Sequence, residues 1–327
     1  MSLSQRVTSA SNYLRGINRS GKVYRLIVEL TNACNLRCLM CPRNEMTREA
    51  SHMEEEMFEK IIAANHQNLE FVSLNGYGEP LLHPQIAECI AVCHRYKVPV
   101  GISTNATMLD EAMAEKILFS CPDVLILAID SVQKDQYELI RVGARLDAVL
   151  ENVDRFLRKV AAREKKPFMV AQSICMPQTR FSIRQFLRYF SRYKGVAVRI
   201  RQLTFSGRQM PDADYRNRSR PCYWLWTEPM VLSNGIVVPC CQDVNGQLAL
   251  GHIDKSSLGA LWQDGYITEL RQKHAAGMRA TIPLCKKCNM YQPGPLSAAA
   301  ASIFHTNSIN KIIPFAETTI SSLRYQV

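Results

Sequence analysis

Short apolar runs alternate with amphipathic stretches from Tyr24 to about Leu203. Six runs are rich in β-branched residues and predict strands at YRLIVEL, FVSLNG, VPVGIST, VLILAID, FMVAQSI and VAVRIRQL. The stretches between them have helical periodicity, as in the segment that places Phe58, Ile61 and Ile62 on one face. Six alternating strand and helix units predict an α/β fold with a parallel sheet, a partial (β/α)6 TIM-like barrel that lacks two of the usual eight units.

A smaller unit follows the predicted barrel. Residues 206–221 are polar, rich in turn formers and without periodicity, which predicts a linker. Two apolar runs around Ser233-Asn234-Gly235 then predict a β-hairpin, and SLGALWQDGYITELRQKHAAG predicts a helix. We therefore expect the following order: an N-terminal extension at 1–23, the barrel at 24–205, the linker at 206–221, a hairpin-plus-helix domain at 222–291 and a C-terminal tail at 292–327.

Charge and the length of apolar runs narrow the class of protein. The 327 residues include 40 Lys and Arg against 29 Asp and Glu, a formal net charge of +11. Most basic residues are dispersed along amphipathic segments, so solvated helix faces are the simpler explanation and an anionic substrate or partner is the alternative. No apolar run approaches the roughly 18 residues that span a bilayer, and the first residues lack a signal-peptide pattern. We expect a cytoplasmic chain without a membrane span.

Twelve cysteines point to metal ligation, because a reducing cytoplasm keeps thiols from forming disulfides. Cys34, Cys38 and Cys41 form a C-x3-C-x2-C pattern after the first predicted strand, at the edge of the sheet where barrel sites collect. A structural zinc site needs four protein ligands, whereas an iron–sulfur cube held by three thiolates leaves one iron open to a small molecule. The three-cysteine set therefore favours the open cube.

The C-x3-C-x2-C pattern resembles the signature of the radical S-adenosyl-L-methionine (SAM) enzymes. In that family the open iron of a [4Fe-4S] cluster binds the amine and carboxylate of SAM. Cleavage of SAM yields a 5′-deoxyadenosyl radical that abstracts a hydrogen atom from carbon. The resemblance implies SAM as a cofactor, and as a partner an external one-electron reductant such as flavodoxin or ferredoxin.

Further segments match places where the family contacts SAM. GYGEPLLHP resembles the Gly-Gly-Glu-Pro motif, with Tyr77 in place of one glycine, and ISTNAT resembles the third-strand segment that lines the cofactor cavity. LAIDS matches the fourth strand, but Ala128 replaces the family's usual serine. The resemblance implies that Met40 packs on the adenine of SAM. Arg141 resembles the arginine that pairs with the methionyl carboxylate, and the alternative is that it is a solvated residue of a helix. The implied cofactor contacts are Met40, Gly78, Glu79, Pro80, Ser103, Asn105, Asp130 and Arg141.

A second set of four cysteines lies in the smaller unit, spaced C-x17-C-x44-C-x2-C. By ligand type alone this set suits either a four-thiolate zinc site or a closed iron–sulfur cube. The hairpin, the helix and the Cys-x2-Cys knuckle resemble the SPASM/Twitch extension of radical SAM enzymes, and the resemblance implies one auxiliary [4Fe-4S] cluster. The expected metal ligands are Cys34, Cys38, Cys41, Cys222, Cys240, Cys285 and Cys288.

Five cysteines remain outside both sets. Cys89, Cys93, Cys121 and Cys175 lie within helix or strand patterns and are expected to be buried and inert. Cys241 adjoins an expected ligand, so a substitute ligand, a structural thiol and a catalytic hydrogen-atom donor are all open to it.

Three functions are open to such a chain. The four-cysteine spacing is similar to that of the family's aminocyclitol dehydrogenases, which implies oxidation of a carbinol carbon of a sugar, aminocyclitol or aminoglycoside; a thiol hydrogen donor would instead cause epimerisation. Peptide or protein maturation is common among SPASM/Twitch enzymes, although only about 23 residues precede the first strand, where peptide-directed members carry a leader-binding domain. A nucleic-acid-binding zinc ribbon would need two four-ligand sites and clustered charge, which disfavours it.

Overall fold

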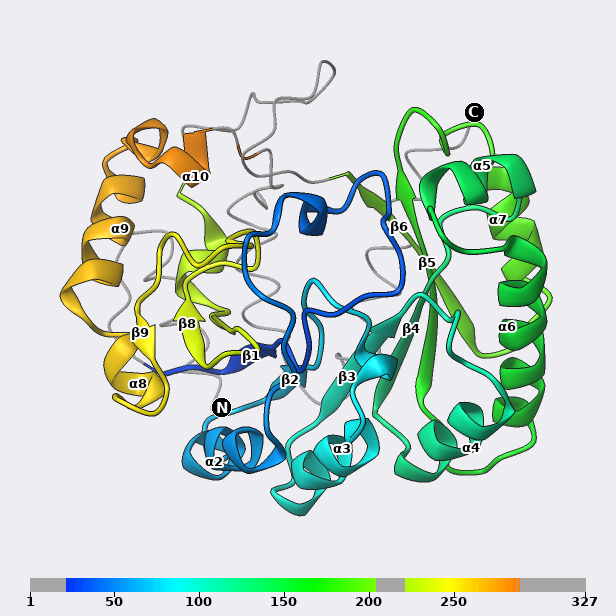
Figure 1. Ribbon diagram of the computed structural model, residues 1–327, viewed down its shortest axis with the longest axis horizontal. Helices are drawn as coiled ribbons and strands as arrows, with labels where there is room; N and C mark the ends of the chain where they lie inside the picture. Colours follow the sequence, from blue (N-terminus) through cyan, green and yellow to red (C-terminus); the bar gives the residue numbers. More distant parts are fainter. Residues whose placement is uncertain (1–21, 204–220, 287, 289–327) are drawn as a thin grey trace.

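The computed structural model describes residues 22–203, 221–286 and 288. Most of the expected N-terminal extension, almost all of the expected linker and the whole tail lie outside these residues. Within them, strands and helices alternate along the chain as the hydrophobic pattern predicts (Figure 1). No helix in this part of the chain is long and apolar enough to cross a membrane.

The strands form a nine-stranded sheet in the order β6-β5-β4-β3-β2-β1-β7-β8-β9. The first six strands pair in parallel with their neighbours in the chain, and within the described sheet β1 and β6 do not meet, so the barrel is open. This arrangement confirms the predicted partial barrel. The six strands are β1 Arg25–Val28, β2 Phe71–Ser73, β3 Val100–Thr104, β4 Val124–Ala128, β5 Phe168–Cys175 and β6 Val196–Gln202.

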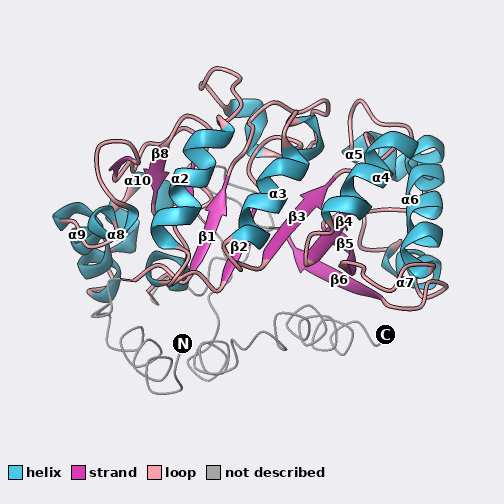
Figure 2. Ribbon diagram, turned by 90° about the horizontal axis from the view of Figure 1, so that it is seen from below, coloured by secondary structure: helices cyan, strands magenta, loops and turns pink. Residues whose placement is uncertain are grey.

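Helices α2, α3, α4 and α6 run along one side of these strands (Figure 2). α2 (Glu55–Asn65) buries Phe58, Ile61 and Ile62, which is the face that the sequence pattern predicts. The side chains of this stripe pack against the sheet because helical periodicity brings them to one side. The other helices of the barrel are α3 Ile86–Arg95, α4 Glu111–Ser120, α5 Lys134–Ile140, α6 Leu146–Ala161 and α7 Ile183–Phe190.

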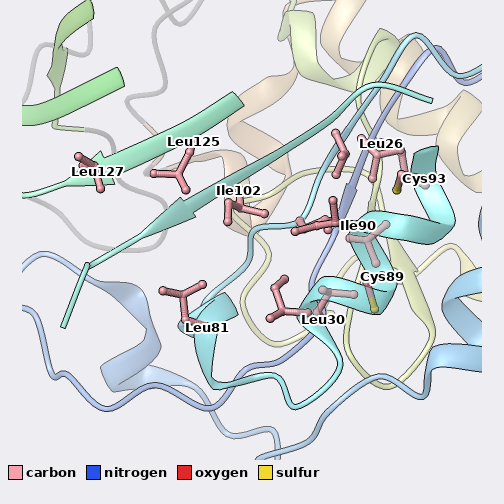
Figure 3. Close-up of a cluster of buried hydrophobic side chains, with 14 of the residues drawn as sticks. Leu26, Leu30, Leu81, Cys89, Ile90, Cys93, Ile102, Leu125 and Leu127 are labelled. Atoms are coloured by element: carbon pink, nitrogen blue, oxygen red, sulfur yellow. The ribbon is translucent and has the colours of Figure 1, made fainter. Parts of the chain in front are cut away.

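Alternation along β4 separates the two faces of the sheet. Leu125 and Leu127 enter the main core together with Ile102 of β3 (Figure 3). Val124 and Ile126 belong to a separate apolar cluster, because successive side chains of a strand point to opposite faces. The loops at the carboxyl ends of these strands are where a barrel of this kind builds its site.

The smaller unit continues the sheet of the barrel. β7 (Met230–Val231) pairs in parallel with β1, and β8 (Ile236–Val238) pairs antiparallel with β7. This confirms the predicted hairpin, whose turn contains Gly235 with a φ of +82°, a conformation that favours glycine. β9 (Gly251–His252) completes the sheet. The sequence pattern did not reveal that β7 covers the free edge of β1.

The helix predicted after the hairpin is two helices. α8 (Leu258–Leu261) ends before Asp264, and α9 (Gly265–Ala275) begins directly after it. The Asp264 side chain accepts a hydrogen bond from the amide of Tyr266 (2.8 Å), which satisfies a free amide at the start of the second helix and explains the break. The short helical turns of the unit are η3 Tyr223–Trp226, η4 Arg279–Thr281 and α10 Pro283–Lys286.

Candidate active site

The loop that carries the first three cysteines is paired with the chain that follows α5. The amide of Arg37 donates a hydrogen bond to the carbonyl of Val142 (2.9 Å), and the amide of Leu39 donates to the carbonyl of Ile140 (2.8 Å). Main-chain groups therefore fix the position of this loop, because its amides find partners outside the loop itself.

The three thiols of the loop influence one another electrostatically. Cys38 is buried, and Cys34 and Cys41 are partly exposed. Burial, with repulsion from Cys38 and Cys34 added to it, raises the pKa of Cys41 to about 11. Burial is also the main cause that raises the pKa of Cys34. A bound metal would reverse this effect, because a coordinating thiol loses its proton.

Arg141 places a positive charge beside the buried thiol. Its Nη1 donates to Sγ of Cys38 (3.6 Å), and its Nε donates to Oδ2 of Asp130 (2.8 Å). Nη2 forms an ion pair with the same oxygen at 2.7 Å. Burial opposes the guanidinium charge, but Asp130 and Cys38 outweigh it, so the pKa of Arg141 is raised. The structure thus brings Asp130 and Arg141, two predicted SAM contacts, together with Cys38, a predicted metal ligand. The contact of Asp130 and Arg141 with SAM stays a prediction.

Tyr137 of α5 adds an unusual polar group to this place. The side chain is fully buried, and its hydroxyl has no hydrogen-bond partner among the residues that the structure describes. Burial raises the pKa of Tyr137, and the nearby thiol of Cys38 raises it further. Buried hydroxyls nearly always have a hydrogen-bond partner, so the unpartnered hydroxyl of Tyr137 would suit a bound group that offers a hydrogen-bond acceptor near Cys38.

Glu79 is fully buried and joins the loops after β2 and β3. Its Oε1 accepts hydrogen bonds from the amide of Leu81 (3.1 Å) and the hydroxyl of Thr104 (2.7 Å), and its Oε2 accepts from the amide of Asn105 (2.8 Å). Burial raises the pKa of Glu79, although these bonds favour the carboxylate. Pro80 begins the next helical turn, η2 Pro80–Leu82, so this motif acts as a rigid connector.

Gly78 lies directly against the cysteine loop. A Cβ atom at this position would lie 2.2 Å from the carbonyl oxygen of Thr31 and 2.6 Å from that of Ala33. The next amide, that of Glu79, donates to the same Ala33 carbonyl (2.9 Å). Gly78 therefore allows the close backbone approach that the sequence predicts, and the backbone that approaches it in the structure is that of the cysteine loop.

The other predicted SAM contacts lie on neighbouring segments. The amide of Ser103 donates to the side chain of Asn75 (2.7 Å), and Nδ2 of Asn105 donates to Oδ1 of Asn35 in the cysteine loop (3.1 Å). Met40 is partly buried and packs against the main core. These contacts tie the ends of β2 and β3 to the cysteine loop, so the predicted residues belong to one region.

The four thiols of the second set come from separate pieces of the smaller unit, namely Cys222, Cys240, Cys285 and Cys288. Burial, with repulsion from Cys222 and Cys288 added to it, raises the pKa of Cys285 to about 12. His274 of α9 accepts a hydrogen bond from the amide of Cys222 (3.1 Å), and Nη2 of Arg279 donates to the carbonyl of Cys288 (3.2 Å). Buried side chains therefore hold both ends of the set.

Tyr77 connects the Gly-Glu-Pro loop with this second set. Its hydroxyl donates a hydrogen bond to the main-chain carbonyl of Cys241, and its ring packs with Met230, Leu232 and Val238 of the hairpin. Burial raises the pKa of Tyr77 well above its ordinary value, and the thiol of Cys241 raises it further. The sequence places Tyr77 in the motif but gives no sign of this distant partner.

Glu29 is a second link between the two units that sequence analysis missed. Its buried carboxylate accepts hydrogen bonds from Nη1 (2.7 Å) and Nη2 (3.0 Å) of Arg48. It also accepts from the amide of Tyr77 (3.1 Å) and from the amide and hydroxyl of Ser233 (both 3.1 Å). The available signal was an acidic residue at the end of the apolar run YRLIVEL, because a buried charge needs partners.

The remaining cysteines differ in their surroundings. Cys89 and Cys93 of α3 are fully buried and Cys121 is buried, as predicted, whereas Cys175 at the end of β5 is partly exposed. Cys241 shares a hydrogen bond with Cys240, which lowers the pKa of Cys241 and raises that of Cys240. Its role as a hydrogen-atom donor stays a prediction.

Both thiol sets fit iron–sulfur clusters by the chemistry of their donors. Every expected ligand is a cysteine sulfur, and the sets offer three and four thiolates. Among the described side chains, no group of three or more His, Cys, Asp or Glu is close enough to hold a single metal ion. Besides burial, repulsion from Cys38 and Cys34 raises the pKa of Cys41, and repulsion from Cys222 and Cys288 raises the pKa of Cys285, so these thiols lie near one another within each set.

The sequence matches two family models. Residues 28–190 match the Radical SAM superfamily, and residues 222–289 match an iron–sulfur cluster-binding domain known as SPASM. The first range contains the three-cysteine loop, and the second contains the set of four cysteines.

Similar proteins agree with these matches. The chain is 24% identical to the S-adenosyl-L-methionine-dependent 2-deoxy-scyllo-inosamine dehydrogenase of Niallia circulans, over 82% of this chain and 94% of the relative. Several other curated relatives are matched over only about half of their own length, 45% to 47%.

Two solved structures share the fold. BtrN in complex with AdoMet and 2-DOIA has a TM-score of 0.56 at 18% identity, over 82% of this chain and 93% of that chain. SuiB of Streptococcus suis bound to S-adenosylmethionine has a TM-score of 0.64 at 15% identity, over 82% of this chain and 71% of that chain.

Proposed function

Because the chain belongs to the radical SAM superfamily and carries a SPASM domain, we propose that it oxidises a hydroxyl-bearing carbon of a sugar, aminocyclitol or aminoglycoside to a ketone. SAM and [4Fe-4S] clusters are the cofactors of these domains, and when bound they supply the one-electron chemistry that breaks an unactivated C–H bond. We assign Cys34, Cys38 and Cys41 to the SAM-binding cluster. The four cysteines of the smaller unit are assigned to the auxiliary cluster.

The link between the two thiol sets is the observation on which this proposal rests. Oxidation of a carbinol to a ketone removes a hydrogen atom, a proton and one further electron, so an electron acceptor must lie near the substrate. Tyr77 of the Gly-Glu-Pro loop donates to the carbonyl of Cys241, which adjoins the assigned ligand Cys240. The auxiliary thiols therefore neighbour the loop that would hold SAM. The dehydrogenase relative, matched over 94% of its length, supports the same reaction type.

In this proposal the chain's own residues bind and orient. Glu79 holds the loops after β2 and β3 in one arrangement through three hydrogen bonds. Asp130 fixes the guanidinium of Arg141, which places its positive charge beside Cys38. Such pre-arranged groups position the reactants without rearranging during the reaction.

The test is an anaerobic incubation of the reconstituted enzyme with candidate sugars and aminoglycosides in heavy water. Oxidation predicts 5′-deoxyadenosine together with a product that is lighter by the mass of two hydrogen atoms and has no carbon-bound deuterium. Epimerisation, with Cys241 as the donor, predicts a product with carbon-bound deuterium from the solvent. Failure of every hydroxylated substrate to increase 5′-deoxyadenosine above the level without substrate would count against the proposal.

Peptide maturation is the second candidate function. SuiB shares the fold and has also been solved bound to its precursor peptide SuiA, so this scaffold is compatible with a peptide substrate. The same incubation with a panel of peptides distinguishes the two. Release of 5′-deoxyadenosine with peptides alone would favour maturation and reject the sugar substrate.

A further inference from the structure

Arg279, at the start of the turn η4, is a buried cation. The residue is 3% exposed, its Nη2 donates to the carbonyl of Cys288 (3.2 Å), and its buried Nε has no hydrogen-bond partner among the described residues. No carboxylate in the part of the chain that the structure describes forms an ion pair with it. Burying an unpaired charge is costly, so buried charges in proteins are usually paired. The guanidinium of Arg279 therefore suits a bound anion.

Main-chain hydrogen bonds hold this cation beside the thiols of the second set. The amide of Ile282 donates to the carbonyl of Arg279 (3.2 Å), and the amide of Cys285 donates to the carbonyl of Ile282 (3.0 Å). Two consecutive hydrogen-bonded turns thus connect Arg279 with Cys285, and the Nη2 bond connects it with Cys288. Burial and the neighbouring thiols raise the pKa of Cys285, and the positive charge of Arg279 opposes them. The guanidinium is therefore close enough to the thiols to act on them electrostatically.

The other polar groups around these thiols do not neutralise the cation. Two acids are buried in the described part of the smaller unit: the carboxylate of Asp243 accepts from two main-chain amides (2.8 and 2.7 Å), and Glu228 is paired with Arg25 (2.9 Å). His274 accepts from a main-chain amide through Nδ1 (3.1 Å), which requires a neutral ring. The exposed cations of this region, which water screens, are Arg201 and Lys286. Arg279 is thus the buried cation that these groups leave without an anion.

We propose that Arg279 is the countercharge of the auxiliary cluster and raises its reduction potential. A cube held by four thiolates is an anion and becomes more negative when it is reduced, so a buried guanidinium stabilises the reduced state more than the oxidised state. A higher potential would make the auxiliary site a better acceptor for the electron that oxidation of a carbinol releases. The inference rests on the assignment of the four cysteines in the proposed function, and it gives Arg279 a role that is exerted through the cluster and not on the substrate.

The test is a redox titration of the reconstituted holoenzyme without substrate, followed by electron paramagnetic resonance. A full-length variant with alanine at Cys34, Cys38 and Cys41 retains only the auxiliary ligands and identifies the signal of the auxiliary cluster. Arg279→Gln removes the charge but keeps an amide that can donate to the carbonyl of Cys288. We expect this variant to disfavour the reduced state about tenfold, a shift of about 59 mV to lower potential for a one-electron couple. Arg279→Lys retains the charge and should stay close to the parent.

Lys286→Gln is the matched control. It removes one positive charge next to Cys285, but Lys286 is exposed, so the potential should change much less than in Arg279→Gln.

The outcomes separate charge from shape. An unchanged potential in Arg279→Gln would overturn the inference and leave the proposed oxidation standing, since the heavy-water incubation tests that reaction independently. An equal fall in Arg279→Lys would also overturn it, because the effect would then depend on the shape of the arginine. Loss of the auxiliary cluster in Arg279→Gln with retention in Arg279→Lys would support the countercharge, whereas loss in both variants would reject it.

Discussion

The hydroxyl of Tyr77 donates a hydrogen bond to the main-chain carbonyl of Cys241. Tyr77 belongs to the Gly-Glu-Pro loop of the barrel, whereas Cys241 belongs to the smaller unit and adjoins a predicted cluster ligand. One side chain therefore connects the two regions in which iron–sulfur chemistry is expected.

Replacing Tyr77 with Phe should remove this bond while retaining the apolar contacts of the ring. We expect the free energy of unfolding to fall by about 1 kcal/mol, the usual net value of one hydrogen bond. If the bond positions the auxiliary site, less oxidised product should form for each 5′-deoxyadenosine released. Tyr96→Phe is a matched control, because the Tyr96 hydroxyl donates to Glu59 on a distant helix (3.3 Å). An unchanged ratio of product to 5′-deoxyadenosine would argue against this positioning role.

Replacing Glu29 with Gln should destabilise the protein strongly. Arg48 is largely buried and would lose its charge partner, so we expect a loss of about 3–5 kcal/mol in the free energy of unfolding. The double variant Glu29→Gln/Arg48→Met should recover part of this loss, because it removes the unpaired charge. Urea unfolding measures both values. Equal stability of the single and double variants would show that the ion pair is not the cause.

Replacing Gly78 with Ala should disturb the cysteine loop. The new methyl group would overlap the carbonyl oxygens of Thr31 and Ala33, which are backbone atoms that cannot rotate away. We expect fewer irons per chain after reconstitution, with the deficit limited to the SAM-binding cluster. Gly195→Ala is a control for this measurement, because a Cβ there meets no atom within 4 Å, although its φ of +82° adds backbone strain. Normal iron content in Gly78→Ala would contradict the expected overlap.

The titration of His83 should lower the free energy of unfolding in mild acid. Its Nε2 bonds to the carbonyl of Met53 (2.9 Å), and its Nδ1 accepts from the amide of Gln85 (3.2 Å), so both ring nitrogens are engaged in the neutral form. Burial lowers the pKa of His83 in the folded protein. As pH falls below about 6.5, the unfolded chain binds a proton first, and stability decreases until the folded pKa is reached.

The His83 effect is measured by urea unfolding at several values between about pH 7.5 and 5.5. Its slope should not exceed about 1.4 kcal/mol per pH unit, the limit for one group. The variant His83→Gln removes this titration, so its stability should depend less steeply on pH than that of the parent. Identical slopes for the two proteins would assign the acid sensitivity to other groups.

Local pattern was sufficient for the strands and the hairpin, because both depend on residues close in the chain. β-branched runs located β1 to β6, and the turn around Gly235 located the hairpin. Hydrogen bonds between residues far apart in the chain were not predictable, because no residue near Glu29 in the sequence indicates that Arg48 or Ser233 is its partner. The break at Asp264 was missed for another reason, since the apolar spacing continues through it and only the N-cap hydrogen bond interrupts the helix.

The pairing of β7 with β1 attaches the segments that carry the two thiol sets to one continuous sheet. β1 leads into the first cysteine loop, and β7 belongs to the unit that holds the other four cysteines. Neighbouring strands lie about 4.8 Å apart and share main-chain hydrogen bonds, so the two halves have no hinge at this seam. A slip in the register of β7 on β1 would therefore shift the hairpin that leads to Cys240 relative to the first cysteine loop.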